Sequence, residues 1–346
     1  MGAFKYTVIF LLPAAVLLGA WLGGAWTLLA VGVAFGALPV LDARVGLDTE
    51  NPDAEAEARL ADSLPYRGVT WLVAPVQAGT LLGAVWWAAQ PERTGLERVG
   101  IAVSLGVSGG AMGITVAHEL VHRVNLRLEP VLGQALLCMV SYMHWGLEHV
   151  AGHHRHVATP ADPATARRGQ SVYAFWFQTV FGTLRSAARL HAERQARRKR
   201  RPWGIRNGFI WCLILPAALA AALGLWLGPV AVLVFAIQSF VAISLLEVVN
   251  YVEHYGLARR EIAPGRYERV APEHSWNASH RLTNWFLFML QRHSDHHAHP
   301  GRRYPVLRHF DEAPQLPAGY ATMVLLALVP PLWFRVMDKR LPEGTE

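Results

Sequence analysis

Long apolar runs alternate with polar segments along the chain. Each apolar run has about the 20 residues that a helix needs to cross a bilayer, and a soluble protein would not need several such uncharged runs. The pattern therefore predicts an all-α integral membrane protein with six transmembrane helices, at roughly 6–23, 25–41, 69–90, 99–117, 206–227 and 230–250.

The segments between these runs predict how the helices are connected. Short turns at Gly23-Gly24 and Gly228-Pro229 should join the first two and the last two helices. The polar insert 118–205 and the tail 251–346 should form a helical cap on one face of the membrane. The apolar run 321–336 contains Pro330-Pro331, which favours a docked or interfacial helix over a seventh span. We expect a single domain, 1–346.

The charge balance agrees with a membrane protein. Only 16% of the residues are charged, against about 25% in an ordinary soluble domain. The net charge is +7, and the basic residues gather in the insert and the tail, with a cluster at 194–201. Because Lys and Arg favour the cytoplasmic side, we predict that the insert, the tail and both termini are cytoplasmic. The cluster suits anionic lipid, and no surrounding module indicates that it binds nucleic acid.

The chain has two cysteines, Cys138 and Cys212, and they form no CxxC pair. Neither an iron–sulfur, a rubredoxin-type nor a cysteine-ligated zinc site is possible from them. No cleavable signal peptide is evident, since the apolar run after Lys5 continues too far and lacks a small-residue cleavage site.

The histidines give the strongest sign of chemistry. All 16 lie at or after position 118, so the first four predicted helices have none. They form four groups at the ends of the predicted helices and in the tail. The groups are HELVH at 118–122, EHVAGHH at 148–154, NYVEHYG at 250–256 and LQRHSDHHAHP at 290–300.

The spacing within the groups is that of metal ligands. His118 and His122 are four residues apart, as are His149 and His153, so each pair should share one helix face. His154 would be turned about 100° away, toward a neighbouring metal. The last group should place three imidazoles on one face as a half-site, namely His293, His296 and His297.

Together the groups offer nine candidate ligands, too many for one ion and suited to two. They are His118, His122, His149, His153, His154, His254, His293, His296 and His297. Imidazole suits iron, zinc and copper. Four carboxylates adjoin these histidines and should orient the rings or join the ligands: Glu119, Glu148, Glu253 and Asp295.

Three other interpretations of the histidines are weaker. A His-rich surface tract would bind metal only by accident, but it does not explain four separate groups. A zinc protease with HExxH needs one further ligand, far fewer than are present. A metal transporter should carry polar residues in mid-span, which the first four helices lack.

The four groups resemble the motifs of membrane-integral non-haem di-iron enzymes of the desaturase–hydroxylase class. More narrowly, HELVHR, EHVAGHH, NYVEHYGL and LQRHSDHHAHPGRRYP are similar to the motifs of the bacterial alkane 1-monooxygenases. General desaturases share the HxxHH spacing but not the last two strings. The resemblance covers nearly the whole chain.

This resemblance implies that the nine histidines bind two non-haem irons and that dioxygen is the co-substrate. It implies terminal hydroxylation of medium- or long-chain n-alkanes to 1-alkanols in the bacterial cytoplasmic (inner) membrane. Electrons would come from a separate rubredoxin, reduced by rubredoxin reductase and NAD(P)H, because the tail has no CxxC that would indicate a fused one. A hydroxylase of alkyl-aromatics or a fatty acyl desaturase is the alternative.

Further expectations concern the surroundings of the site. Arg302, Arg303 and Arg308 are candidates for docking an acidic electron carrier, although positive-inside topology explains them equally well. A substrate channel should be lined by small and bulky residues, from Trp71, Val76, Gly79, Leu82, Trp86, Gly106, Gly109, Gly110 and Gly113. The remaining histidines should be surface or hydrogen-bonding residues (His144, His156, His191, His274, His309), with His299 a support and His280 open.

Overall fold

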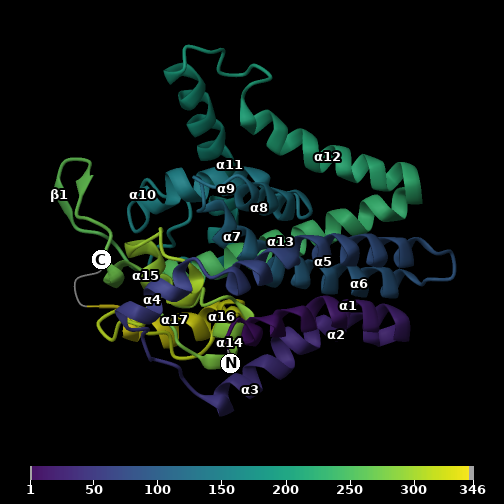
Figure 1. Cartoon of the computed structure of the whole chain (residues 1–346), viewed down its shortest axis with the longest axis horizontal. Coiled ribbons are helices and arrows are strands. Elements are labelled where there is room, and N and C mark those ends of the chain that lie inside the picture. Colours follow the sequence, from purple (N-terminus) through teal and green to yellow (C-terminus); the bar gives the residue numbers. More distant parts are fainter. Residues whose placement is uncertain (1, 343–346) are drawn as a thin grey trace.

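Six long apolar helices form the centre of the structure, a computed structural model that describes residues 2–342. Their length and composition suit membrane spans, which confirms the predicted all-α architecture with six spans (Figure 1). They are Ala3–Leu22, Gly24–Val45, Leu64–Ala89, Gly95–Val121, Gly208–Leu227 and Pro229–His254.

Three of the spans change their winding along their length, whereas α5 (Leu64–Ala89), α12 (Gly208–Leu227) and α13 (Pro229–His254) are α-helical throughout. The first comprises η1 (Ala3–Phe10) and α1 (Leu11–Leu22). The second comprises η2 (Gly24–Leu28), α2 (Leu29–Val31), η3 (Gly32–Ala37) and α3 (Leu38–Val45). The fourth comprises α6 (Gly95–Ser108), η4 (Gly109–Ile114) and α7 (Thr115–Val121). The segments η3 and η4 are π-helical.

Short connections join the spans at one end of the molecule, on the right in Figure 1. Gly23 and Gly228 adopt φ of 70° and 83°, a left-handed conformation that ends α1 and α12, so both predicted turns are confirmed. At the third turn, Thr94 and Glu97 form a capping box that starts α6.

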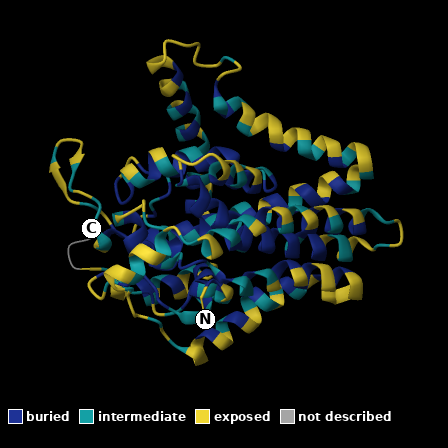
Figure 2. Cartoon of the chain, viewed as in Figure 1, coloured by how far each residue is buried: buried dark blue, intermediate teal, exposed yellow. Residues whose placement is uncertain are grey.

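The fourth span is the central one. Of its 18-residue apolar stretch, 83% is buried inside the protein, against 11% for the corresponding stretch of α12. Figure 2 shows this contrast: the central helices are dark, whereas α12 is mostly exposed. Close packing explains the glycines of the fourth span. A Cβ on Gly106 would lie 2.6 Å from the Cβ of Val241 on α13. A span hydrophobic on all sides and exposed, as α12 is, suits a lipid environment.

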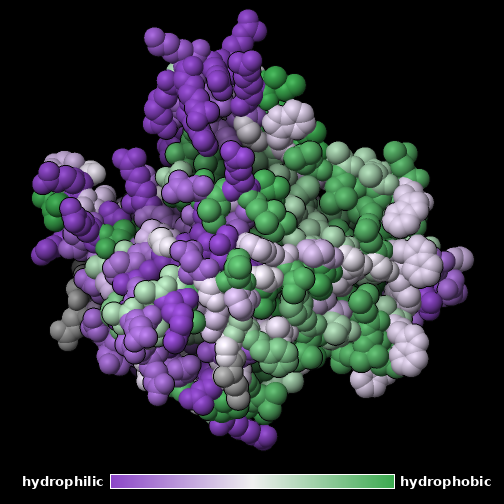
Figure 3. All heavy atoms as spheres, viewed as in Figure 1, coloured by the Kyte–Doolittle hydropathy of each residue, from purple (hydrophilic) through white to green (hydrophobic). Residues whose placement is uncertain are grey.

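The opposite end of the molecule carries the remaining elements and most of the hydrophilic surface, on the left and top of Figure 3. Its hairpin of two short strands projects from the body at the left of Figure 1. The elements are α4 (Ala54–Ala61), α8 (Leu128–Cys138), α9 (Met143–Glu148), η5 (His149–His153), α10 (His154–His156), α11 (Val172–Arg197), β1 (Glu261–Ala263), β2 (Arg266–Tyr267), η6 (Pro272–His274), α14 (Arg281–Phe286), α15 (His293–Ala298), η7 (Tyr304–Val306), α16 (Tyr320–Ala327), α17 (Pro330–Met337) and η8 (Asp338–Arg340).

The apolar run 321–336 is not a seventh span. It folds as two helices of eight residues each, α16 and α17, with the two prolines at the start of α17. Trp333 is fully buried, and its ring centroid lies 5.0 Å from that of Tyr251 on α13. The docked helix that the prolines favoured is therefore confirmed.

Candidate metal centre

The nine candidate histidines come from four segments that meet beside the end of the fourth span. The helix α7 carries His118 and ends at His122, while α13 ends at His254. The others lie on η5 and α10 and on α15. The structure brings all nine into two groups, and within each group the ligand atoms lie within 4.8 Å of one another.

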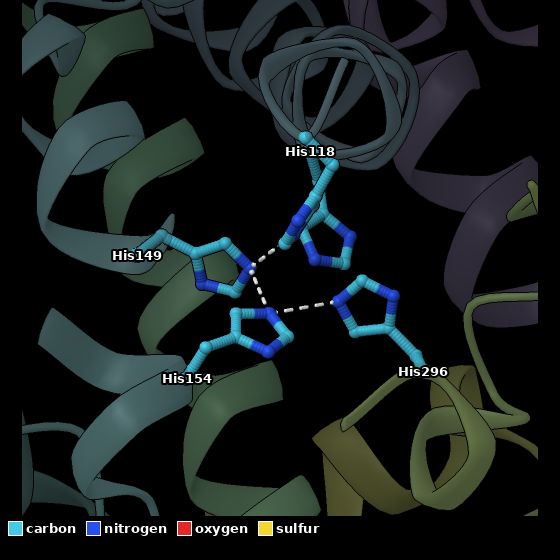
Figure 4. Close-up of side chains that lie close together, drawn as sticks. His118, His149, His154 and His296 are labelled. Carbon is cyan, nitrogen blue, oxygen red and sulfur yellow. Dashed lines mark hydrogen bonds between the residues drawn. The ribbon is translucent and has the colours of Figure 1, made fainter. Parts of the chain in front are cut away.

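The first group, here the five-histidine group, comprises His118, His122, His149, His154 and His296. The Nε2 atom of His149 lies 3.1 Å from that of His122 and 3.1 Å from that of His154, which is 3.0 Å from that of His296. Figure 4 shows the rings of His118, His149, His154 and His296 pointing toward one centre.

The second group, here the four-histidine group, comprises His153, His254, His293 and His297, all of them buried. The Nε2 atom of His293 lies 2.9 Å from that of His297 and 3.2 Å from that of His254. The ring of His153 completes the group, with its centroid 4.8 Å from those of His254 and His297.

This partition differs from the one expected from α-helical spacing. His149 groups with His154 rather than with His153. The segment 149–153 is a π-turn, whose backbone hydrogen bonds join residues five apart instead of four, so the directions of its side chains differ from those in an α-helix. The three histidines of α15 also do not all belong to one group. His293 and His297 join the four-histidine group, while His296 joins the other.

The rings of the five-histidine group outside the membrane spans are held neutral. The pKa values of His149, His154 and His296 lie well below the usual range of a histidine. Burial is the largest cause, and repulsion from the neighbouring imidazoles adds to it. Neutral imidazole is the form that binds a metal.

Unpaired ring nitrogens supply the test of whether a metal fits. The Nε2 atoms of His118 and His153 are buried without any hydrogen-bond partner among the described residues. Buried polar atoms are rarely left so, and the adjacent Nε2 atoms of the other rings are lone-pair donors facing one another. A cation at the centre of each group satisfies both features, so the residues fit two bound metal ions.

Asp162 is the residue that sequence reasoning missed. Its Oδ2 atom accepts a hydrogen bond from His153 Nδ1 at 2.9 Å, and it also accepts one from the Thr165 hydroxyl. Burial alone would lower the pKa of His153, but the Asp162 carboxylate raises it above its ordinary value. Such a bond fixes the ring with Nε2 free and makes it a stronger ligand. Asp162 follows His153 by nine residues, outside every ligand spacing, so no sequence signal marked it.

The four predicted carboxylates have unequal surroundings. Glu253 lies in the site, with its Oε2 atom 3.3 Å from His293 Nε2. Glu119 instead forms an ion pair with Arg123 at 2.8 Å. Glu148 makes no hydrogen bond to a described histidine ring of either group, and burial raises its pKa to about 7.

The fourth carboxylate, Asp295, holds the segment after α15. It accepts hydrogen bonds from the ring of His299 and from the backbone N–H of Arg308. It also pairs with the guanidinium of Arg302. Asp295 therefore fixes the loop that follows α15 rather than the ring of a candidate histidine.

An apolar cavity of about 70 Å³ ends at the histidines. Its wall includes His118, His149, His293 and Glu253. Two spans line it with the same spacing of i, i+1, i+4, i+5 and i+8. These residues are Gly110, Ala111, Ile114, Thr115 and His118 on the fourth span, and Leu245, Leu246, Val249, Asn250 and Glu253 on the sixth. On the α-helical sixth span these lining residues extend over about 12 Å from the end that carries the histidines.

The cavity wall contains only Gly110 among the residues suggested from the sequence. The third span contributes none of them, and the first two spans line the cavity instead, with Leu12, Ala34, Phe35 and Leu38. Gly79 is exposed on the outer face of α5. A Cβ on Gly109 would lie 3.0 Å from the Cγ1 of Val140, so this glycine permits close packing against that residue.

The candidate docking arginines are bound within the protein. Arg302 and Arg308 pair with Glu57 of α4, and Arg303 pairs with Glu129. They fasten the segment after α15 to neighbouring elements, which leaves them poorly placed to meet a partner.

The histidines outside the two groups have varied surroundings. His309 bonds with Asn277 and Ser279, and His274 with the backbone of Ala271, as hydrogen-bonding residues should. His280 precedes α14, and its carbonyl accepts from Gln291.

Comparison with known proteins places this geometry in context. The fatty acid desaturase family model matches residues 97–327. Alkane 1-monooxygenase 2 of Pseudomonas aeruginosa is 45% identical over 94% of this chain and 86% of its own length. Alkane 1-monooxygenase of Acinetobacter baylyi is 40% identical over 88% of this chain and 74% of its own length. The hydroxylase component of a Pseudomonas putida xylene/toluene monooxygenase is 30% identical over 98% and 89%, respectively.

Proposed function

Because this chain belongs to the fatty acid desaturase family, and within it to the alkane 1-monooxygenases, we propose that it hydroxylates medium- and long-chain n-alkanes at the terminal carbon. One alkane, one dioxygen, two electrons and two protons give one 1-alkanol and one water. We propose that two non-haem irons bind at the two histidine groups, and that a rubredoxin, reduced by its reductase and NAD(P)H, supplies the electrons. The apolar cavity that ends at both groups is the observation that carries the proposal.

The donor set supports iron as the metal. Nine imidazoles in two groups provide nitrogen ligands for two ions, and imidazole suits iron as well as zinc and copper. Membership of an oxidoreductase family favours the redox-active choice. The bound irons would activate dioxygen for insertion into a C–H bond. Glu253, beside His293, is placed to complete the ligands of the ion in the four-histidine group.

The cavity accounts for the position of attack. An alkane has no polar group, so it is held only by shape and by apolar burial. A cavity whose lining residues extend about 12 Å along a span suits a chain that enters lengthwise. The end methyl would then meet His118, His149 and His293, and the rest of the chain would exclude water from the site.

The membrane setting follows from the same geometry. The cavity is lined by residues of apolar spans, and alkanes dissolve in the lipid that such spans cross. We propose that the histidine-bearing end and both termini face the cytoplasm of a bacterial inner membrane. The arginines of the insert and the tail support this orientation.

An alkyl-aromatic hydroxylase is the second candidate, because of the 30% identity to the xylene/toluene relative. The higher identities of 45% and 40% favour alkanes. An aromatic ring is also wider than a polymethylene chain and would need a broader cavity.

The test is to reconstitute the purified protein in liposomes with ferrous iron, rubredoxin, rubredoxin reductase and NADH. It would be supplied in turn with n-alkanes of graded length and with xylene. We expect 1-alkanols, detected by gas chromatography, and two irons per chain by metal analysis. Absence of 1-alkanol at every chain length would overturn the alkane proposal, and one ion per chain after full iron loading would overturn the two-iron centre.

A further inference from the structure

A second and larger cavity of about 820 Å³ opens at the hydrophilic end of the molecule. We call it the arginine cleft. One wall is the loop 158–168, and another is the stretch 182–189 of α11. The segment 256–267 forms the third wall and includes part of the hairpin that projects from the body at the left of Figure 1.

Five arginines line this cleft, from all three walls: Arg167, Arg168, Arg185, Arg189 and Arg259. All but Arg259 are exposed. The only described ion pair among them is a loose one, 4.0 Å between Arg189 and Glu193. This contrasts with Arg302, Arg303 and Arg308, whose charges are matched by carboxylates of the chain itself.

Among the residues that the structure describes, the cleft lining contains two carboxylates, and neither forms an ion pair with these arginines. Glu261 accepts a hydrogen bond from the backbone of Gly265 within the hairpin. Asp162 is 3% exposed and is bonded to His153 and Thr165. The arginine cleft is therefore strongly positive and open to a partner of opposite charge.

The cleft also leads to the metal centre. Asp162 lies in its wall, and the Oδ2 atom of that carboxylate is 2.9 Å from Nδ1 of His153 in the four-histidine group. Asp162 alone thus connects the cleft to a histidine of that group.

We propose that the arginine cleft docks a small acidic electron-carrying protein, and that electrons reach the four-histidine group past Asp162 and His153. This inference rests on the proposed function, which requires a reduced carrier. Each docked carrier gives up one electron and leaves oxidised, so two encounters supply the two electrons of one turnover. Opposite charges across the interface would speed encounter and fix orientation.

An anionic lipid surface is the other partner that arginines attract, and the geometry disfavours it. A lipid surface calls for basic side chains in a row beside the apolar spans. Here the arginines surround a hollow on three walls, over the hydrophilic region of the surface (Figure 3). The cluster at 194–201, at the end of α11, suits lipid better.

The test compares two double charge reversals in the full-length protein, held in nanodiscs of neutral phosphatidylcholine. One is Arg185→Glu with Arg189→Glu, within the cleft. The matched control is Arg198→Glu with Arg200→Glu, which removes equal charge from exposed positions outside it. Binding of oxidised rubredoxin is measured by titration at low and at physiological salt, without turnover.

We expect the cleft variant to raise the Kd for rubredoxin at least about tenfold at low salt, and the control to change it less than about twofold. In turnover the cleft variant should raise the KM for rubredoxin and leave the rate with a small chemical reductant unchanged. An unchanged Kd, or equal losses in both variants, would overturn the cleft as docking site. The titration is repeated in nanodiscs that contain anionic lipid, and an effect confined to those nanodiscs would assign the cleft to lipid instead.

Failure of the proposed function is distinguishable from failure of the docking site. Without alkane hydroxylation, no donor would yield 1-alkanol, whereas the binding titration would still report on the cleft. With hydroxylation but docking elsewhere, the wild type would be active and the cleft variant would keep its KM.

Discussion

The two histidine groups use the same ligand type but are held in different ways. The five-histidine group is held by contacts between its rings, and two members, His122 and His154, are only partly buried. The four-histidine group is wholly buried and has two carboxylates beside it, Asp162 and Glu253. A ring fixed by a carboxylate is oriented before the metal arrives, so we expect the four-histidine group to hold its ion more tightly.

Removal of one ligand from each group should have the largest effect. His154→Ala and His297→Ala should each lower turnover by more than about 100-fold, beyond the 10–100-fold typical of an outer partner. Each variant should bind only one iron per chain with full affinity, whereas the wild type should bind two. The remaining iron should be held more tightly in His154→Ala, which leaves the four-histidine group intact. Iron titration with a competing chelator measures this order.

His156→Ala is the control, since it lies beside His154 but outside both groups. It should keep two irons and full turnover. If the remaining iron were held more tightly in His297→Ala, the expected ranking of the two groups would be reversed.

The sequence predicted much of this site because the signals it used are local. Helix spacing placed His118 with His122, and His293 with His297, and the apolar runs located all six spans. Local spacing failed where the winding changes. Relative to the expectation, His153 and His154 exchange groups at the π-turn of 149–153, and nothing in EHVAGHH marks that change.

Features formed by distant segments were beyond prediction. Asp162 reaches His153 through a loop, the cavity wall draws on the first two spans, and Arg303 meets Glu129 across 174 positions. Each depends on tertiary packing rather than on neighbouring residues. The sequence therefore predicted the nine histidines that the structure brings together, and Glu253 beside them, but not Asp162.

Asp162→Asn should weaken the four-histidine group alone. An amide can still fill the space, but it loses the charge that makes His153 a stronger ligand. We expect iron affinity at that group to fall about 10–100-fold, with the five-histidine group unchanged. Glu119→Gln is the matched change beside the other group, and it should leave both affinities unchanged because Glu119 pairs with Arg123. Equal losses in both variants would mean that the two groups are supported alike.

The apolar cavity reaches both groups, so narrowing it should not distinguish them. Ala34→Phe adds a ring to the cavity wall and should reduce turnover of the longest accepted alkanes several-fold, with short alkanes and iron content little affected. Gly79→Phe adds the same ring to the exposed face of α5 and should change neither. Product profiles over a series of n-alkanes measure the shift. A loss of iron in Ala34→Phe would show instead that the wall holds the ligands in place.

The smallest effect should come from the hydroxyl that orients Asp162. Thr165→Val removes the hydrogen bond to Asp162 Oδ2 while nearly keeping the side-chain shape, so Asp162 stays charged but is less firmly aimed at His153. We expect about a two- to fivefold loss of iron affinity at the four-histidine group, less than in Asp162→Asn. Thr159→Val is the control in the same loop, because that buried hydroxyl donates to the carbonyl of His156 and touches no carboxylate. Both substitutions should cost about 1 kcal/mol of stability, so a difference confined to iron binding would isolate the contribution of Asp162.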